Sequence, residues 1–442
     1  MIQIDNKKDC CGCGACAARC PKQCITLQSD EEGFLYPKVD IFTCIDCGLC
    51  EKVCPMIHPH SNEENQQKAY AAINPDDEVR LQSSSGGVFT ILAEQVLTEG
   101  GVVFGARFDE QWQVVIDYTE HVEGLAAFRG SKYVQARTGN SYQQCERFLK
   151  AGRKVLFSGT PCQVSGLHRF LRKSYSQLIT VDFICHGTPS PLVWGKYLQE
   201  VVEAGKQAIG DHSYRVQRLG WKRYKGRIEN NVSEGLSLCF PKDDSHYMRA
   251  FLSDLILRPS CATCPAKEGR SHADLTIADL WGAGQILPEM DDNKGTSLLF
   301  VNTIEGELFL QQLPLRSREI NKQQAVSYNS AYLKSVVMHP KREEFFNDLP
   351  TSTSVTQLID DKLRPTFIQS LIQSYWRIRI YLVKRLLHRS RDCKKGKYIS
   401  EEDISQLSVP MLHAVGVNFR DKAKGWSSYE LTIALSDKKN KS

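Results

Sequence analysis

The feature that most constrains this 442-residue sequence is a pair of four-cysteine runs near its N-terminus. Both follow the spacing Cys-x2-Cys-x2-Cys-x3-Cys-Pro. The first run consists of Cys10, Cys13, Cys16 and Cys20, and the second of Cys44, Cys47, Cys50 and Cys54. A cubane iron-sulfur cluster needs four thiolates at the corners of a tetrahedron. A tight loop supplies three of them, so the fourth has to come from elsewhere in the fold.

This spacing is typical of bacterial ferredoxins with two [4Fe-4S] clusters, in which the fourth cysteine of each run binds the other cluster. It predicts that one cluster is bound by Cys10, Cys13, Cys16 and Cys54. It predicts that the second is bound by Cys44, Cys47, Cys50 and Cys20. A zinc-binding or disulfide knot is the alternative, but zinc sites use paired Cys-x2-Cys units rather than two complete runs. Cys11 and Cys24 are spare and are interpreted as structural.

The cysteine distribution also bears on the compartment, because ten of the seventeen cysteines precede residue 55. The segment before Cys10 lacks the apolar stretch of a secretory signal, and no run of about eighteen apolar residues occurs. We therefore expect a cytoplasmic chain without a membrane-spanning helix. In a reducing compartment, cysteines bind metals or act in catalysis more often than they form disulfides. The length and the hydrophobic content of 41% predict two to four globular domains.

The net charge of +5 is unevenly distributed. Residues 361–400 contain eleven Lys or Arg against two Asp or Glu, which leaves the rest of the chain at −4 and argues against nucleic-acid binding. Residues 367–389 are predicted to form one basic helix. A packing helix with a solvated basic face is favoured over peripheral contact with an anionic membrane, because the apolar residues are spread widely around it.

A polar stretch near residue 60 separates the cysteine-rich segment from a region where short apolar strands alternate with helical patterns. Strands are expected at 102–104, 155–157, 178–184, 275–277 and 298–301, and helices at 88–97, 163–171 and 192–202. This alternation predicts an α/β domain whose functional loops follow the strands. The domains expected are a ferredoxin domain at 1–60, an α/β domain at 68–345, a basic helical region at 346–400 and a tail of unknown role at 401–442.

Four further cysteines have settings that favour a shared site. Cys162 and Cys185 directly follow expected strands, and Cys261 and Cys264 share one loop. If the two strands are neighbours, the first two cysteines project from the same end of the sheet, where the loop can complete a four-thiolate site. We predict a third [4Fe-4S] cluster here, with zinc or unligated core cysteines as the alternatives. The remaining cysteines lack such settings and are interpreted as structural.

Several small polar loops are candidates for a phosphate-bearing ligand. The segment 83–87 opens a helix with a glycine-rich turn, and such a turn presents free N–H groups to a phosphate. Residues 130–133 and 159–160 are similar, and Lys132 can counter the charge of a phosphate or of a reduced flavin. Asp274 and Asp279 flank a strand and are interpreted as structural.

Taken together, these segments resemble the family of coenzyme F-420 hydrogenase/dehydrogenase beta subunits, in its form with a fused N-terminal ferredoxin domain. The motifs that carry the resemblance occur in one order from about residue 68 to 345. They are Ser84-Ser-Gly-Gly, Gly130-Ser-Lys-Tyr-Val-Gln, Leu156-Phe-Ser-Gly-Thr-Pro-Cys-Gln, Cys185-His-Gly-x-Pro-Ser-Pro, Leu257-Arg-Pro-Ser-Cys-x-x-Cys and Asp274-x-Thr-x-x-Asp-x-Trp-Gly. Several motifs in one order are far more specific than any single one.

The resemblance implies an α+β protein in which a small bacterial-ferredoxin-type 2[4Fe-4S] domain is followed by an α/β flavin-binding domain and a basic helical C-terminal region. It implies FAD, with a [4Fe-4S] cluster near the flavin. By motif, the residues at or near the flavin are Ser85, Gly86, Gly87, Ser131, Lys132, Tyr133 and Thr160. The ligands of the nearby cluster are Cys162, Cys185, Cys261 and Cys264. Because relatives reduce either deazaflavins or chlorophyll pigments, the substrate does not follow from the resemblance.

One element departs from the family pattern. Members often carry Asn-Phe-Arg-Asp-Lys-x-x-Gly-Trp in the middle domain, whereas this chain has only Gln217-Arg-Leu-Gly-Trp221 there and the fuller version at 418–426. The role of that element in relatives is therefore not transferred to this chain. Nothing in the sequence specifies a deazaflavin, so coenzyme F-420 itself is an expectation taken from the family.

The function expected is that of an iron-sulfur flavoprotein oxidoreductase. Clusters move one electron at a time, whereas a flavin stores two and exchanges a hydride with an organic molecule. Such a protein reduces or oxidises a small organic substrate or a deazaflavin-like coenzyme, and exchanges electrons with a redox partner protein or a soluble donor. The alternative is a non-catalytic subunit that relays electrons to a separate partner enzyme. A flavin-free redox sensor or scaffold is the third possibility.

Overall fold

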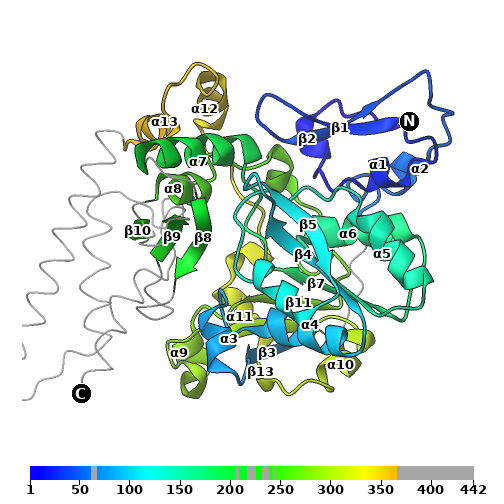
Figure 1. Cartoon of the computed structure of the whole chain (residues 1–442), viewed down its shortest axis with the longest axis vertical. Helices are drawn as coiled ribbons and strands as arrows, with labels where there is room; N and C mark the ends of the chain where they lie inside the picture. Colours follow the sequence, from blue (N-terminus) through cyan, green and yellow to red (C-terminus); the bar gives the residue numbers. More distant parts are fainter. Residues whose placement is uncertain (61–66, 206–208, 217–224, 231–237, 242–244, 366–442) are drawn as a thin grey trace, which may run out of the picture. The chain divides into compact units, whose positions relative to one another are not determined.

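The computed structural model describes residues 1–60, 67–205, 209–216, 225–230, 238–241 and 245–365, with side chains described up to residue 201 and again from 245. The chain divides into two compact units, Met1–Leu363 and Arg364–Ser442. The predicted helix at 367–389, the element at 418–426 and Cys393 lie outside the described residues, and so does the side chain of Cys239. Every described helix and strand belongs to the first unit, shown in Figure 1.

The N-terminal module, residues 1–60, contains one hairpin and two short helices. Its elements are η1 (Lys7–Asp9), α1 (Ala15–Arg19), the antiparallel strands β1 (Ile25–Ser29) and β2 (Leu35–Val39), and α2 (Leu49–Lys52). Both helices begin at a glycine with positive φ, +77° at Gly14 and +68° at Gly48. Side chains are strained at such angles. The glycine that follows the second cysteine of each run therefore allows the sharp turn into the helix.

A mixed sheet of eight strands forms the core of the middle region (Figure 1). Its order is β13-β3-β12-β11-β7-β6-β4-β5, and the central strands β11, β7, β6 and β4 are parallel. The strands are β3 (Lys68–Ile73), β4 (Val102–Phe108), β5 (Val114–Thr119), β6 (Val155–Ser158), β7 (Leu178–Phe183), β11 (Leu275–Asp279), β12 (Ser297–Val301) and β13 (Arg316–Ile320). The five strands predicted from apolar runs are confirmed as β4, β6, β7, β11 and β12.

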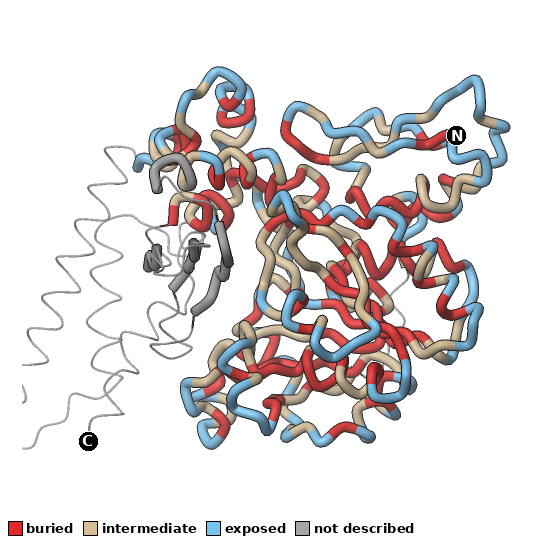
Figure 2. The backbone as a smooth tube through the Cα atoms, viewed as in Figure 1, coloured by how far each residue is buried: buried red, intermediate tan, exposed pale blue. Residues whose placement is uncertain are grey.

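Helices cover both faces of this sheet. Val103 and Leu156 pack toward α4 (Val88–Thr98) and α10 (Ile304–Leu310) on one face. Their neighbours Phe104 and Phe157 pack toward α5 (Ser141–Lys150) and α6 (Pro161–Leu171) on the other. Successive strand residues point to opposite faces of the sheet, so each strand contributes side chains to the hydrophobic cores on both sides. Figure 2 shows the buried residues gathered along the sheet and under the helices.

The other elements flank this layered core. The helices are α3 (Asp77–Leu81), η2 (Val122–Ala127), α7 (Pro191–Gly205), α8 (His246–Leu252), η5 (Pro259–Thr263), α9 (Ala283–Ile286), η6 (Pro288–Met290), α11 (Lys322–Ser327), η7 (Ser330–Tyr332), α12 (Arg342–Asp348) and α13 (Val355–Leu363). A small antiparallel sheet has the order β10-β9-β8, with β8 at Ile209–Val216, β9 at Lys225–Asn230 and β10 at Leu238–Pro241. The helices predicted at 88–97, 163–171 and 192–202 are confirmed as α4, α6 and α7. In the described part of the chain, every helix is too short or too polar to cross a membrane.

Candidate metal centres

The cysteines predicted for the second cluster surround one cavity at the outer end of the N-terminal module. We call Cys20, Cys44, Cys47 and Cys50 the cluster-two cysteines, and all four line this cavity. Backbone N–H groups approach two of the sulfurs, Ile2 N at 3.3 Å from Cys50 Sγ and Asp46 N at 3.4 Å from Cys44 Sγ. Such contacts stabilise charge on a cluster's sulfurs. Because Cys47 is exposed, this cavity lies at the protein surface.

The cysteines predicted for the first cluster lie together on the inner side of the module. These cluster-one cysteines are Cys10, Cys13, Cys16 and Cys54. Burial raises the pKa of the Cys16 thiol to about 12, and the neighbouring thiols of Cys10 and Cys54 contribute to this shift. Cys13 interacts in the same way with Cys16 and Cys54. Mutual effects of this kind require short separations, so the fold brings this set together too.

The four cysteines predicted for a third cluster line another cavity, at the carboxyl ends of the central strands. These third-site cysteines are Cys162, Cys185, Cys261 and Cys264. The first lies in the opening turn of α6, just after β6, and the second lies two residues after β7. The other two lie within and directly after η5. The strands β6 and β7 are parallel neighbours, which meets the condition on which the shared site depended.

The position of Cys162 follows from its local sequence. Thr160 caps α6 with a reciprocal capping box, in which its hydroxyl accepts a hydrogen bond from Gln163 N while the Gln163 side chain accepts one from Thr160 N. Pro161 takes the first helical position, where its missing N–H costs nothing. This cap fixes the helix start, and the Thr160 hydroxyl lies 3.1 Å from the Cys162 sulfur.

The third site is buried, and a backbone N–H group donates to one of its sulfurs. Thr188 N donates to Cys261 Sγ at 3.4 Å, and Lys267 Nζ donates to the Cys185 carbonyl at 2.6 Å. Burial raises the pKa of the Cys185 thiol well above its usual value and that of Cys264 to about 11. Four soft donors from three segments match the needs of an iron-sulfur cluster, whose iron supplies the charge that keeps them deprotonated. In the described part of the chain, no group of three or more His, Cys, Asp or Glu side chains is already arranged to hold a single metal ion.

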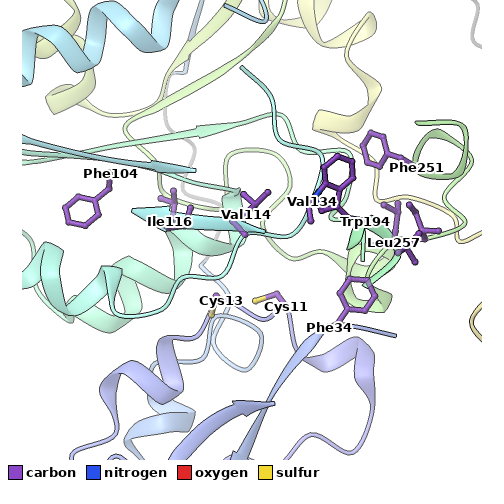
Figure 3. Close-up of a cluster of buried hydrophobic side chains, with 14 of the residues drawn as sticks. Cys11, Cys13, Phe34, Phe104, Val114, Ile116, Val134, Trp194, Phe251 and Leu257 are labelled. Carbon is purple, nitrogen blue, oxygen red and sulfur yellow. The ribbon is translucent and has the colours of Figure 1, made fainter. Parts of the chain in front are cut away.

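Cys11, which belongs to none of the three predicted ligand sets, lies between two of them. Its thiol is buried and lines the third-site cavity together with Cys162, and the neighbouring thiol of Cys13 raises its pKa. Figure 3 shows Cys11 and Cys13 at the boundary between the N-terminal module and the middle region. One thiol thus contacts a predicted ligand of the first cluster and one of the third. Nothing in the cysteine spacing signals this role.

The loop that carries Cys10 to Cys13 is bonded to the middle region along its backbone. Three middle-region side chains donate to its carbonyls: Arg258 to Cys10 (2.8 Å), Gln135 to Cys11 (3.1 Å) and Thr138 to Cys13 (3.1 Å). On the other side of the loop, α6 comes so close that a Cβ added at Gly166 would lie 3.0 Å from the Cys13 sulfur. The first cluster's loop is therefore fixed beside the third site.

The residues predicted near a flavin fall into two adjoining loops and one helix cap. Ser131 donates to the Ser84 hydroxyl from its N–H (2.7 Å) and its hydroxyl (3.0 Å), which joins the two loops. Gly86 N donates to the Ser297 hydroxyl at 3.0 Å, and Gly87 starts α4 with a φ of +76°. Because β3 runs parallel to β11, these loops lie at the same edge of the sheet as the third-site cysteines.

The polar groups of these loops have partners within the protein. Lys132 Nζ donates to the carbonyls of Ala127 (2.9 Å) and Arg129 (2.6 Å), and burial lowers its pKa to about 7. The Ser85 hydroxyl donates to the Thr296 carbonyl at 3.1 Å, and the Tyr133 carbonyl accepts from the Tyr247 hydroxyl at 2.7 Å. Of the described residues that line the third-site cavity, none is one of the seven predicted flavin contacts.

Two buried aspartates, Asp182 in β7 and Asp274 just before β11, have different surroundings. The Asp274 carboxylate accepts hydrogen bonds from the hydroxyls of Thr180 and Thr303, both at 2.7 Å, which agrees with the structural role expected for it. Asp182, which the sequence did not single out, lines the third-site cavity. Burial raises its pKa to about 7, although hydrogen bonds from Ser271 and Thr276 oppose the shift.

Comparison with protein families matches two parts of the chain. Residues 152–325 match the family described as the C terminus of the coenzyme F-420 hydrogenase/dehydrogenase beta subunit. Residues 9–56 match the 4Fe-4S dicluster domain. The second match covers both cysteine runs of the N-terminal module, and the first covers all four third-site cysteines.

Individual relatives resemble part of the chain. The F subunit of F(420)H(2) dehydrogenase from Methanosarcina mazei is 26% identical over 183 residues, which is 39% of this chain and 51% of that protein. Coenzyme F-420-dependent sulfite reductase of Methanocaldococcus jannaschii is 28% identical over 211 residues, 45% of this chain and 31% of that protein. The chain thus matches about half, or less, of the length of these relatives.

One solved structure is also similar, from the F-420-reducing [NiFe] hydrogenase complex of Methanosarcina barkeri. The TM-score is 0.40 at 16% identity, over 64% of this chain and 97% of that one. The chain therefore contains a region, residues 152–325, that matches the C terminus of the coenzyme F-420 hydrogenase/dehydrogenase beta subunit, together with a 4Fe-4S dicluster domain at residues 9–56.

Proposed function

We propose that this chain is an iron-sulfur flavoprotein oxidoreductase in which electrons pass between the N-terminal clusters and a flavin through a third [4Fe-4S] cluster. Its family match and its dicluster domain already establish a relation to iron-sulfur redox proteins. The observation that carries the further step is the Cys11 thiol, which contacts both Cys13 and Cys162. A relay between two clusters needs such a close approach.

The ligands proposed for the three clusters are the sets that the fold brings together. Cluster one would be held by Cys10, Cys13, Cys16 and Cys54. Cluster two would be held by Cys20, Cys44, Cys47 and Cys50, and the third cluster by Cys162, Cys185, Cys261 and Cys264. Around the third cluster, Thr188 N–H donates to the Cys261 sulfur, and the charge of Lys267 favours the thiolates of Cys185 and Cys264.

The flavin would lie at the sheet edge formed by the glycine-rich loop and the Gly130–Tyr133 loop. Open α/β sheets bind ligands at the carboxyl ends of their parallel strands, and both loops lie there. The residues that would hold FAD are Ser85, Gly86, Gly87, Ser131, Lys132, Tyr133 and Thr160. When bound, FAD supplies storage of two electrons and exchange of a hydride. The chain's own part would be to orient it by the backbone N–H groups at the start of α4 and by the Lys132 side chain.

The outer end of the N-terminal module is the place proposed for exchange with a redox partner protein. Phe42 is 95% exposed, and Ile41 and Ile45 are more than half exposed, all beside the cluster-two cysteines. Exposed apolar side chains gathered in this way are typical of protein contacts. The names of the relatives suggest coenzyme F-420 or a similar small molecule as the hydride partner at the flavin.

A second candidate is a subunit that relays electrons to a separate catalytic partner. One of the relatives is named as a subunit of a dehydrogenase, which favours this alternative. Anaerobic mixing of the reduced chain alone with a deazaflavin separates the two candidates. Oxidation of the clusters together with stoichiometric reduction of the deazaflavin supports the enzyme, whereas activity that appears only after a partner is added supports the relay.

Iron, acid-labile sulfide and flavin content of anaerobically purified protein test the cofactors directly. About twelve irons and one FAD per chain are expected. About eight irons and no flavin would contradict both the third cluster and the flavin.

A variant assigns the third cluster to its site. Cys162→Ala should lower the iron content by about four, leaving two clusters. The matched control is Cys145→Ala, because Cys145 is a fully buried cysteine of α5 in the core rather than at the third-site cavity. This control should retain all its iron, and an equal loss in both variants would point to general destabilisation instead.

A further inference from the structure

Arg258 makes the most extensive set of contacts at the junction between the N-terminal module and the middle region. It is completely buried. Its guanidinium donates three hydrogen bonds, to the Cys10 carbonyl (2.8 Å), the Leu35 carbonyl (2.9 Å) and the Gln135 amide oxygen (3.1 Å). The central carbon of the guanidinium, Cζ, also lies 4.3 Å from the centre of the Tyr36 ring. Arginine can bond to several acceptors at once because its guanidinium holds its N–H donors in one rigid plane.

The Arg258 guanidinium makes its direct contacts with uncharged groups. Within the described residues, the guanidinium bonds to carbonyl and amide oxygens and packs on aromatic rings, and none of these partners is a carboxylate. A buried cation is costly unless an anion compensates it. Thiolate-bound iron-sulfur clusters are anionic, and predicted ligands of two clusters lie on either side of Arg258.

Arg258 is also linked to the third site. It lies three residues before Cys261, and the loop that its guanidinium contacts carries Cys11, which lines the third-site cavity together with Cys162 and Cys261. The chain adds a direct link, because Cys261 N donates to the Arg258 carbonyl at 3.0 Å.

On its other side, Arg258 packs directly on the cluster-one loop. Gly12 has a φ of +71°, and a Cβ added there would lie 2.8 Å from Arg258 Nη1 and 2.7 Å from the Gln135 amide nitrogen. The guanidinium therefore rests against the backbone between Cys11 and Cys13. A shift of Arg258 would move the thiol of Cys11, which contacts Cys162.

We propose that Arg258 is the positioning residue of an electron-transfer junction, holding the cluster-one loop against the third-site thiols and making the third cluster easier to reduce. This inference rests on the proposed third cluster. In the step concerned, one electron leaves reduced cluster one and enters the oxidised third cluster, and no covalent bond is formed or broken. The positive charge favours the state with the added electron.

The test is a redox titration of the full anaerobic chain, followed by electron paramagnetic resonance, for Arg258→Gln and Arg258→Lys. Arg258→Gln removes the charge. It should lower the equilibrium constant for reduction of the third cluster by about tenfold or more. For one electron, each tenfold change lowers the reduction potential by about 59 mV. Arg258→Lys keeps the charge but replaces the fork by a single nitrogen. It should leave the potential near that of the parent chain and alter the magnetic interaction between reduced cluster one and the third cluster.

Arg342 provides a matched control. It too joins the N-terminal module to the rest of the chain, by a bidentate ion pair with Glu32 and a 2.8 Å hydrogen bond to the Leu257 carbonyl. These bonds do not involve the Cys10–Cys13 loop. Arg342→Gln should therefore leave both the potential of the third cluster and the magnetic interaction unchanged. An equal shift in the Arg342 and Arg258 variants would overturn the proposal, since it would reflect loosening of the interface alone.

Two results with the Arg258 variants would also overturn the proposal. Unchanged potential and interaction in an Arg258→Gln protein with full iron content would overturn the proposal while leaving the three clusters intact. If Arg258→Gln does not retain its clusters, Arg258→Lys decides, and an unaltered interaction there would overturn the positioning role. Failure of the proposed function is distinguishable, because the unsubstituted chain would then contain only about eight irons.

Discussion

The two cysteine runs of the N-terminal module have the same spacing and the same glycine at the start of the following helix, yet their surroundings differ. The loop of the first run is bonded through three carbonyls to side chains of the middle region. The second run lies at the outer end, where Cys47 is exposed. A repeated motif thus fixes the same local geometry twice, while residues far away in the sequence decide which copy faces inward.

The module therefore has an inner end beside the middle region and an outer end at the protein surface. The inner loop places Cys11 against Cys162, and so beside the third site. The outer cavity is lined by Cys44, which follows the exposed Phe42 by two residues. If both cysteine sets of the module hold clusters, the outer one is the accessible site for a protein partner, and the inner one is the neighbour of the third. The comparison can be tested by making the same change in both copies.

The largest difference is expected for alanine at the two helix-starting glycines. Gly14→Ala and Gly48→Ala both put a side chain at positive φ, which costs roughly 1–2 kcal/mol. At Gly14 the added Cβ would also lie 2.5 Å from the Thr138 hydroxyl, whereas at Gly48 it meets nothing within 4 Å. Overpacking of this kind costs about 1–3 kcal/mol more. Anaerobic denaturant unfolding, followed by cluster absorbance, should show the greater loss for Gly14→Ala.

The further substitution Thr138→Ala tests whether this clash causes the additional loss of stability. Added to Gly14→Ala, it removes the hydroxyl that the new Cβ would meet and should recover part of the lost stability. It also removes the hydrogen bond to the Cys13 carbonyl, so recovery should be incomplete, by about 0.5–1.5 kcal/mol. Equal destabilisation by alanine at the two glycines would contradict the difference in surroundings.

The parts of the fold that the sequence predicted are those with a strong local signal. The central strands β6 and β7 are short apolar runs buried on both faces, and they were expected where they occur. The edge strand β13 was not predicted, because its sequence Arg-Ser-Arg-Glu-Ile is largely exposed and has no apolar run. Strand formation at such a position depends on pairing with β3 rather than on the segment itself.

The same distinction applies to the candidate site. Cysteine sets could be predicted because their spacing within a loop already limits what they can bind. Arg258 could not, since the side chain and the Cys10 carbonyl that it contacts are 248 residues apart. Cys11 looked spare for a related reason, because its contact with Cys162 exists only once the module packs on α6. Spacing therefore predicts which cysteines can share a cluster, whereas the junction between the predicted sets depends on tertiary packing.

A smaller effect is expected at the outer end of the module. Phe42→Ser should slow reduction of the clusters by a reduced ferredoxin-type protein several-fold, since exposed aromatic side chains are frequent anchors of protein contacts. Stability should change by no more than about 0.5 kcal/mol, because the ring is 95% exposed. Anaerobic stopped-flow absorbance measures the rate.

The control for this variant is Ile304→Ser, which alters a side chain of α10 that is 74% exposed on the middle region. Its rate with the protein donor should equal that of the parent chain. Dithionite, a small reductant that needs no docking surface, should reduce all three proteins equally fast. A Phe42→Ser protein that accepts electrons from the protein donor at the parental rate would show that the outer end is not the contact surface.

The smallest effect is expected where the module ends against the middle region. His60 stacks on His272 with ring centres 4.1 Å apart, and burial lowers the pKa of His60 to about 3, helped by the charges of His272, Arg169 and His168. In the unfolded chain a histidine has a pKa near 6.5. As the pH falls below that value, the unfolded chain binds a proton that the folded chain does not bind. Stability is therefore lost as the pH falls from about 6.5 toward 3.

His60→Gln should flatten this dependence, because glutamine does not titrate. Between pH 7.5 and 6.0, the midpoint of thermal unfolding should fall less in His60→Gln than in the parent chain. His58→Gln is the matched control, since His58 is an exposed histidine two residues away, and its pH dependence should follow that of the parent. Because all three proteins carry the same cysteines, acid loss of clusters affects them alike and cancels in the comparison. If His60→Gln and His58→Gln change the slope equally, the acid sensitivity does not originate at the buried contact between the module and the middle region.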